Sequence, residues 1–172
     1  MGMDVFGKAP TSEVGEYFRR NVWGWHPLWE MCEDLFPTIT RLVECGHSND
    51  GDGLDAILSA ELSDGLTEAV ADGRVASWID QRNAHVAALP MEKCRICEGT
   101  GIRSDEIGLA HGWHDKALPP EEAIVLGREF GSCNACHGHG ESAPWLASYE
   151  VIPDDAVEFS EFLGACGGFE IC

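Results

Sequence analysis

The spacing of apolar residues predicts two consecutive helices in the middle of the chain. Positions three and four apart are apolar along residues 54–70 and again along residues 75–89, as expected of helices that bury one face. The dipeptide Asp72-Gly73 interrupts the pattern and is typical of a turn. We therefore expect a helical hairpin. Its two apolar stripes are Leu54, Ile57, Leu58, Leu62, Leu66 and Val70, and then Val75, Trp78, Ile79, Val86 and Leu89.

Shorter helical patterns precede this hairpin. Ser12 can cap a first helix, which Gly24 should break. Pro27 and Pro37 stand where two further helices would begin, because proline is favoured in a first helical turn. The second of these helices should stop at Gly46.

The C-terminal part alternates between strand and helix signals. Residues 147–152 have a strand pattern, and a helix is expected from Asp154, with Phe159 and Phe162 on its apolar face. Residues 169–171 alternate apolar and polar side chains. We expect this last strand to pair with the one at residues 147–152.

Acidic residues outnumber basic ones by thirty to eleven, which gives the chain a net charge of -19. Residues 42–73 and 129–172 contain no Lys or Arg. Such segments repel a phosphate backbone, so direct nucleic-acid binding is disfavoured. Two explanations remain open: a solvated surface that keeps the protein soluble, and a field that attracts a protein partner with a basic surface.

The length of 172 residues and the hydrophobic content of 44% suit one main core with a small inserted module. No apolar run approaches the roughly 20 residues that cross a bilayer. The opening MGMDVFGKAP lacks the pattern of a secretory signal. We expect a soluble cytoplasmic protein without a membrane partner, and the sequence does not indicate its oligomeric state.

The phrase CRICEGTG at residues 94–101 returns as CNACHGHG at residues 133–140. Two Cys-x-x-Cys pairs can complete one tetrahedron around a metal ion. The repeated glycines suit the sharp turn after each pair, which directs backbone N–H groups toward the thiolates. The ligands would be Cys94, Cys97, Cys133 and Cys136. One structural Zn²⁺ is favoured over redox pairs or disulfides, because neither a βαβ context nor a secretory signal is visible. The basic residues Lys93, Arg95 and Arg103 would offset part of the thiolate charge.

The repeated phrase Cys-x-x-Cys-x-Gly-x-Gly resembles the zinc-binding repeat of the DnaJ-type cysteine-rich domain. The resemblance covers only the two eight-residue repeats, and four copies in that family bind two zinc ions, so two copies would bind one. His26-Pro27 is followed by Leu28, so the His-Pro-Asp signature of a J-domain is missing. The resemblance therefore implies a metal-held hairpin that binds proteins, rather than a co-chaperone or a reaction.

A looser resemblance extends over most of the chain. It is carried by YFRRNVWGWHPLW, GHSNDGDGL, CEGTGIRSD, CNACHGHG, ASYEV and FLGACGGFEIC. Together these segments resemble a group of uncharacterised phage and bacterial proteins. The resemblance implies a phage or prophage setting and supplies no catalytic residues. By analogy, it also implies action by occupying a host protein, such as a nucleic-acid-binding or defence protein.

These patterns predict a mainly α protein with a minor β-sheet, built as a helical domain with an inserted zinc-knuckle hairpin. We expect an acidic helical region over residues 1–92. A zinc-knuckle module with its enclosed loop should cover residues 93–141. The remaining residues, 142–172, should form a strand, a helix and a strand that pack on the helical region.

Two other clusters of polar residues are candidates for a calcium-binding loop and for a catalytic metal site. The segment at residues 47–55, HSNDGDGLD, resembles a calcium loop, but Ser59 stands where a bidentate Glu is required, so a turn that caps the next helix near Asp52 is favoured. A weak cation site there remains open. The four histidines of the knuckle region lack the spacing of a catalytic metal site, and nucleophile or phosphate-loop motifs are not visible. They are His111, His114, His137 and His139.

Candidate partner-binding residues follow from this organisation. The knuckle encloses residues 98–132, where PPEEAIVLGREF predicts one short helix and Trp113 and His114 are the first candidates for contact. The acidic candidates are Asp50, Asp52 and Asp55. An aromatic cluster could be either core or an exposed binding surface; it consists of Trp23, Trp25, Trp29 and Phe36.

The sequence favours a zinc-stabilised acidic protein that binds another protein and inhibits or modulates a host factor. Two alternatives remain open: a metal- or thiol-dependent enzyme, and a chaperone-like zinc-finger module or nucleic-acid binder. Metal content and thiol titration separate a closed structural site from a reactive one.

Overall fold

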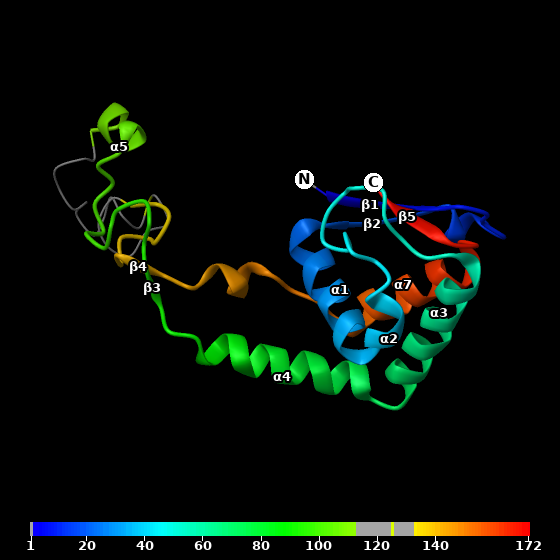
Figure 1. Cartoon of the computed structure of the whole chain (residues 1–172). Coiled ribbons are helices and arrows are strands. Elements are labelled where there is room, and N and C mark those ends of the chain that lie inside the picture. The colour runs from blue at the N-terminus through cyan, green and yellow to red at the C-terminus, as the bar shows by residue number, and fades with distance from the viewer. Residues whose placement is uncertain (1, 113–124, 126–132) are drawn as a thin grey trace. The chain divides into compact units, whose positions relative to one another are not determined.

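The computed structural model of the chain describes residues 2–112, 125 and 133–172. These residues form two compact units (Figure 1). The first unit combines residues 1–87 with 148–172, and the second consists of residues 88–147. The protein is mainly α-helical with two small sheets, as the sequence predicts.

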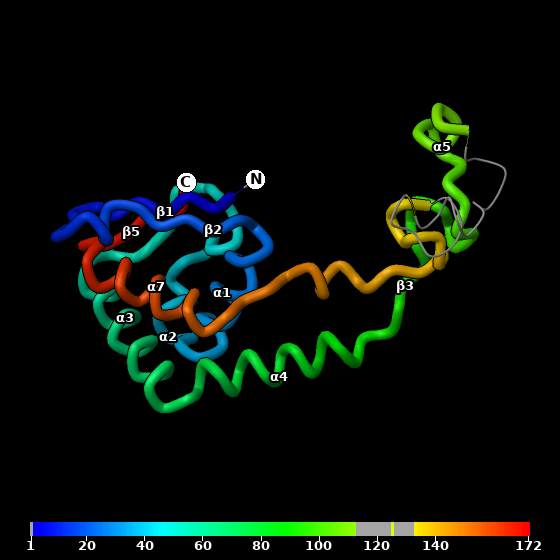
Figure 2. Tube along the Cα trace, turned by 180° about the vertical axis from the view of Figure 1, so that it is seen from behind, coloured from blue at the N-terminus to red at the C-terminus, as the bar shows by residue number. Residues whose placement is uncertain are grey.

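The first unit contains a three-stranded antiparallel sheet in the order β2-β1-β5, which Figures 1 and 2 show from opposite sides. The central strand is β1 (Gly2–Gly7), and Val5 lies opposite Phe18 of β2 (Tyr17–Asn21) and Ile171 of β5 (Phe169–Ile171). All three side chains are buried. The sheet therefore joins segments from the two ends of the chain.

Two predictions about this sheet are wrong. Residues 17–21 are strand β2, preceded by a 3-10 turn, η1 (Glu13–Gly15), where the sequence predicted a helix capped by Ser12. Phe18 points into the core while its neighbours are exposed, so the alternation of a strand outweighs the short helical pattern. The last strand pairs with β1, whereas residues 149–152 form no strand and residues 145–148 form a 3-10 turn, η2 (Trp145–Ser148).

Helix α1 (Val22–Leu35) begins before Pro27, which lies inside it and does not start it. Asn21 caps this helix by accepting the Gly24 N–H at 2.9 Å. Because proline has no N–H, the carbonyl four residues earlier, that of Trp23, lacks its helical partner. The backbone N–H of Glu150 donates to that carbonyl at 3.2 Å. A contact from another segment thus compensates for the proline.

The predicted helical hairpin is present. Helix α3 (Ala56–Ala71) is capped by Asp55, which accepts the Leu58 N–H at 2.9 Å, and α4 (Arg74–Ala88) follows directly. The helix expected between Pro37 and Gly46 is shorter, α2 (Pro37–Thr40).

The expected C-terminal helix is α7 (Pro153–Ala165), and it packs against α3. The two helices are also joined by a hydrogen bond from the Ser63 hydroxyl to the Ser160 carbonyl at 2.7 Å.

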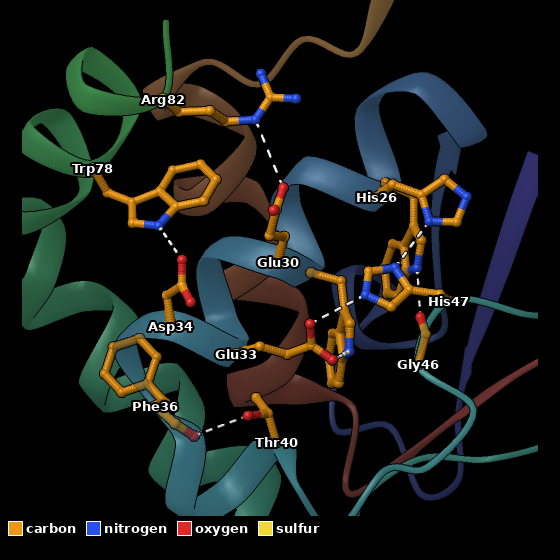
Figure 3. A network of polar contacts seen from close by, with 12 residues as sticks. His26, Glu30, Glu33, Asp34, Phe36, Thr40, Gly46, His47, Trp78 and Arg82 are labelled. Atoms are coloured by element: carbon orange, nitrogen blue, oxygen red, sulfur yellow. Dashed lines mark hydrogen bonds and ion pairs between the residues drawn. The ribbon is translucent and has the colours of Figure 1, made fainter. Parts of the chain in front are cut away.

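Within the first unit, polar side chains join α4 to α1, as Figure 3 shows. The indole N–H of Trp78 donates to Asp34 at 2.7 Å, and the Arg82 guanidinium lies 3.7 Å from the Glu30 carboxylate. Arg82 also donates to the carbonyl of Tyr149 at 3.0 Å.

The core of the first unit is aromatic. Trp25 and Trp29 are fully buried and stacked, with ring centroids 5.7 Å apart, and Phe159 meets Trp25 edge-on at 5.6 Å. Trp23 is half-buried. The aromatic cluster of α1 is therefore divided: two of its tryptophans form core, and the third lies at the surface of the unit.

The second unit is built on a short antiparallel stem, in which β3 (Glu92–Lys93) pairs with β4 (Glu141–Ser142). It also contains a short helix, α5 (Glu106–Ala110). The helix expected in PPEEAIVLGREF lies outside the described residues except for Val125. Among the described residues, no helix combines the length and apolar character needed to cross a bilayer.

Candidate metal centre

Four buried cysteine sulfurs converge at the end of the β3–β4 stem. The sulfurs of Cys94, Cys97, Cys133 and Cys136 all lie within 4.8 Å of one another. Those of Cys94 and Cys133 are 3.9 Å apart, and those of Cys97 and Cys136 are 3.7 Å apart. A tetrahedral ion with metal–sulfur bonds of about 2.3 Å requires sulfurs about 3.8 Å apart. The cluster could therefore hold one metal ion with four sulfur ligands.

The two repeated phrases build this site by exchanging backbone hydrogen bonds. The Cys94 N–H donates to the Gly140 carbonyl at 2.8 Å, and the Cys133 N–H donates to the Gly101 carbonyl at 3.0 Å. Each phrase therefore positions the first cysteine of the other. This reciprocity explains why one Cys-x-x-Cys-x-Gly-x-Gly phrase occurs twice.

Glycine is required where the backbones of the two repeats approach each other. Gly101 and Gly140 have φ values of 70° and 82°, in the left-handed region that disfavours other residues. A Cβ atom on Gly101 would lie 2.2 Å from the carbonyl oxygen of Gly138. A Cβ atom on Gly140 would lie 2.4 Å from that of Gly99. Both positions therefore combine an unusual backbone conformation with a close backbone approach.

Backbone N–H groups also point at the sulfurs. Gly101 donates to the sulfur of Cys97 at 3.3 Å, and Gly140 donates to that of Cys136 at 3.2 Å. Such bonds stabilise the thiolate form that binds metal. The sequence predicted this task for the repeated glycines.

The thiols of the cluster differ in acidity. Burial raises the pKa of Cys133 to about 12. Burial acts in the same direction on Cys97, but the Gly101 N–H and the thiols of Cys136 and Cys94 lower its pKa to about 7. The pKa of Cys97 therefore lies well below that of Cys133. Binding of a divalent ion releases the protons of the thiols that are still protonated, so metal affinity should rise with pH.

Of the three basic residues near the cluster, Arg103 is the buried one. Its guanidinium makes two bonds to Asp105, at 2.8 and 2.9 Å, and also donates to the Asn134 side chain. Its charge acts on the thiolates of Cys94 and Cys133. Arg103 therefore links the first knuckle to the second, which supports the predicted offset of thiolate charge.

The other two basic residues lie further out. The Arg95 side chain is 86% exposed and 4.0 Å from Glu92, whereas the aliphatic part of Lys93 lies against Gly99.

The three predicted acidic residues all have partners within the first unit. Asp52 accepts the N–H groups of Cys45 and Gly53, both at 2.8 Å, and the bond from Cys45 is the main cause of a lowered pKa. Asp55, not Asp52, caps α3. Asp50 accepts the hydroxyl of Ser48. The other two candidates, Trp113 and His114, lie outside the described residues.

A cluster on the first unit escaped the sequence reasoning. The ring nitrogens of His26 and His47 are 2.9 Å apart, and His47 also contacts Glu33 at 3.1 Å (Figure 3). Burial, and then the neighbouring His47, lower the pKa of His26. His26 and Glu33 are seven residues apart and so share one helical face, which is the signal that could have pointed to this contact. The contact attaches residues 44–53 to α1.

Among the described residues, the four cysteines are the one group of three or more Cys, His, Asp or Glu whose ligand atoms lie within 4.8 Å of one another. The segment at residues 47–55, all of which is described, forms no such group. The candidate chemistry of the described chain is therefore concentrated in the knuckle.

Comparison with known proteins gave no match to a protein-family model, a curated protein or a solved structure.

Proposed function

We propose that this protein binds a basic protein partner through its first unit, and that one zinc ion closes its second unit. The observation that carries the proposal is the surplus of carboxylates on the first unit, which has 21 acidic and six basic residues. Four of the six are arginines that already lie against carboxylates of the same unit: Arg19, Arg20, Arg74 and Arg82. The outward field of this unit is therefore strongly negative.

Two packed helices carry a large part of this surplus. Helices α3 and α7 lie against each other, and each has three exposed acidic residues at spacings that follow one helical face. We call these residues the acidic stripes: Glu61, Asp64 and Glu68 on α3, and Asp154, Glu158 and Glu161 on α7. Charge complementarity with a basic surface would accelerate association and favour that partner over acidic ones.

Zinc is the ion that the cysteine cluster suits best. Four thiolates in a tetrahedron are typical of structural zinc sites, and four protein ligands leave no position for a substrate. Metal analysis of the purified protein should find one zinc ion per chain. A thiol reagent should modify the four cluster cysteines only after a chelator has removed the metal. A loosely held metal, or rapid modification of Cys97 with metal bound, would instead support a metal- or thiol-dependent enzyme.

The partner is tested with two variants of equal net charge. The first replaces the α3 stripe, as Glu61→Gln, Asp64→Asn and Glu68→Gln; the control replaces three exposed acids elsewhere on the unit, as Glu13→Gln, Glu16→Gln and Asp80→Asn. Wild-type protein should retain a basic protein from a bacterial lysate, with an affinity that falls as salt rises. The stripe variant should lose it and the control should keep it. An equal loss in both variants, or no basic partner, would contradict the proposal.

The looser resemblance to phage and bacterial proteins directs the search to bacterial hosts. We propose that occupation of the partner's basic surface inhibits or modulates that host protein. Competition between this protein and a nucleic acid for the identified partner tests the step directly. If the two bind the partner together without competition, the inhibitory part of the proposal is wrong.

A further inference from the structure

A surface cavity of about 410 Å³ lies where β2, the start of α1 and the approach to α7 meet. Trp23 and Ile152 supply apolar lining, Gly24 leaves room beside them, and Glu150 and Asp155 supply carboxylates. Its volume falls in the range of sites that bind small molecules or single side chains, roughly 300 to 1,000 Å³. The cavity lies entirely within the first unit.

The fold holds the Trp23 side of the cavity in place. The Glu150 N–H donates to the Trp23 carbonyl at 3.2 Å, where Pro27 has no N–H to donate. The Trp23 ring also meets the ring of Tyr149 edge-on, with centroids 5.2 Å apart. Trp23 and Glu150 therefore face the same cavity from two segments more than a hundred residues apart in sequence.

The charges around the cavity leave a negative surplus. Arg20 also lines it, but its guanidinium bonds to Asp155, at 2.8 Å, and to Glu158. The second oxygen of Asp155 accepts the Ile152 N–H at 2.9 Å. Arg20 is the one basic residue among the lining residues, whereas Glu150 and Asp155 are acidic, and Glu158, outside the lining, also takes part of the Arg20 charge. An anion at Arg20 would have to displace two carboxylates, so the cavity disfavours it.

We propose that this cavity receives the cationic side chain of a lysine or arginine from the basic partner. The proposal rests on the proposed function and names the contact that would anchor it. The aliphatic part of such a side chain would lie against Ile152, and its charge would lie over the Trp23 ring and near the Glu150 carboxylate. A neutral side chain of the same shape would gain only the apolar contact.

The test uses capped tripeptides and the six tryptophan indole N–H signals in a ¹H–¹⁵N spectrum. The Trp23 signal is assigned with Trp23→Phe. A Gly-Arg-Gly or Gly-Lys-Gly peptide should shift this signal in a saturable manner, with a dissociation constant on the order of millimolar. Gly-citrulline-Gly, a neutral analogue of the arginine peptide, should bind at least about ten-fold more weakly, as loss of a cation–π contact and an ion pair predicts.

Two variants locate the peptide. A Cβ atom on Gly24 would meet its nearest neighbours at 3.7 to 3.8 Å, an ordinary contact distance, so Gly24→Leu should fold and fill the cavity. It should abolish the shift of the Trp23 signal. Glu150→Gln should weaken binding about five-fold. Glu44→Gln, an exposed acid outside the cavity lining, should change nothing.

The outcomes separate the two proposals. Equal binding of the arginine and citrulline peptides, or a Trp23 shift caused by inorganic phosphate alone, overturns the cationic pocket. Retention of the basic partner by Gly24→Leu also overturns the pocket and leaves the proposed function standing. Saturable arginine binding that Gly24→Leu abolishes supports the pocket, even if no basic protein is recovered and the proposed function fails.

Discussion

The backbone N–H of Glu150 takes the place that a helical N–H would have taken at the carbonyl of Trp23, at a distance of 3.2 Å. Pro27 lies inside α1 and has no N–H to donate, and an N–H of the segment leading into α7 donates instead. A residue that normally disrupts a helix here ties a distant part of the chain to it.

Replacing this proline should loosen that connection. Pro27→Ala restores an N–H that competes for the Trp23 carbonyl, so the Glu150 amide should exchange with deuterium several-fold faster. Pro153→Ala is the matched control, because Pro153 stands in the first turn of α7, where no N–H is needed. Unchanged exchange of Glu150 in Pro27→Ala would show that the proline does not govern this contact.

The glycines of the knuckle should differ in their tolerance of alanine. Gly99 and Gly101 have φ values of 86° and 70°. The three atoms nearest to a Cβ on Gly99 belong to the flexible side chain of Lys93, whereas those nearest to a Cβ on Gly101 belong to the backbone of Gly138. Gly99→Ala should weaken the free energy of zinc binding by about 1 kcal/mol, which is the strain of the left-handed conformation alone. Gly101→Ala should cost about 3 kcal/mol or more, which is about a hundred-fold loss of zinc affinity. Competition with a chelator measures both; equal losses would refute the backbone clash.

Removal of the metal should unfold one unit and spare the other. The four cysteines are the buried apolar cluster of the described part of the second unit, whereas the first unit has its own aromatic core. A chelator should therefore collapse the amide signals of the β3–β4 stem and leave the indole signals of Trp25 and Trp29 unchanged. Cys133→Ser should do the same without a chelator, and Cys172→Ser, at an exposed position, should not. Loss of the Trp25 and Trp29 signals would mean that the units depend on each other.

Acid should weaken the first unit partly through Asp52. The Cys45 N–H, with that of Gly53, lowers the pKa of Asp52 in the folded state below its unfolded value of about 3.9. Asp52 therefore contributes stability above that value, and the contribution is lost as the pH falls through its folded pKa. Denaturant unfolding between pH 6 and about 3 should show a smaller loss in Asp52→Asn than in wild type. Asp50→Asn, at an exposed position, should behave like wild type.

The sequence predicted the parts of the fold that depend on local pattern. The helical hairpin followed from apolar spacing, and the cysteine cluster from two phrases with the same internal spacing. The last strand of the sheet was predicted, but β1, β2 and the strand pairing were missed, because the paired segments lie far apart in the chain: Val5 pairs with Ile171 near the opposite end. Such pairing leaves no local trace beyond a brief alternation of side chains.

Local rules also misplaced two helix starts. Pro27 suggested a first turn, but a distant N–H, that of Glu150, makes the proline acceptable inside the helix. The acidic segment at residues 47–55 offered several caps, and Asp55 takes that position because Asp52 is used by the N–H groups of Cys45 and Gly53. In both cases a tertiary contact decided between local alternatives.

The β3–β4 stem has a consequence for how the chain assembles. Helices α3 and α7 pack together, yet the 60 residues from 88 to 147 separate the two parts of the first unit. Joining the ends of so long a loop costs conformational entropy that grows with the logarithm of its length. Once the four cysteines come together and Lys93 pairs with Glu141, two positions near the ends of this loop are already joined. If the knuckle folds first, the entropy cost of bringing β5 to β1 is therefore smaller.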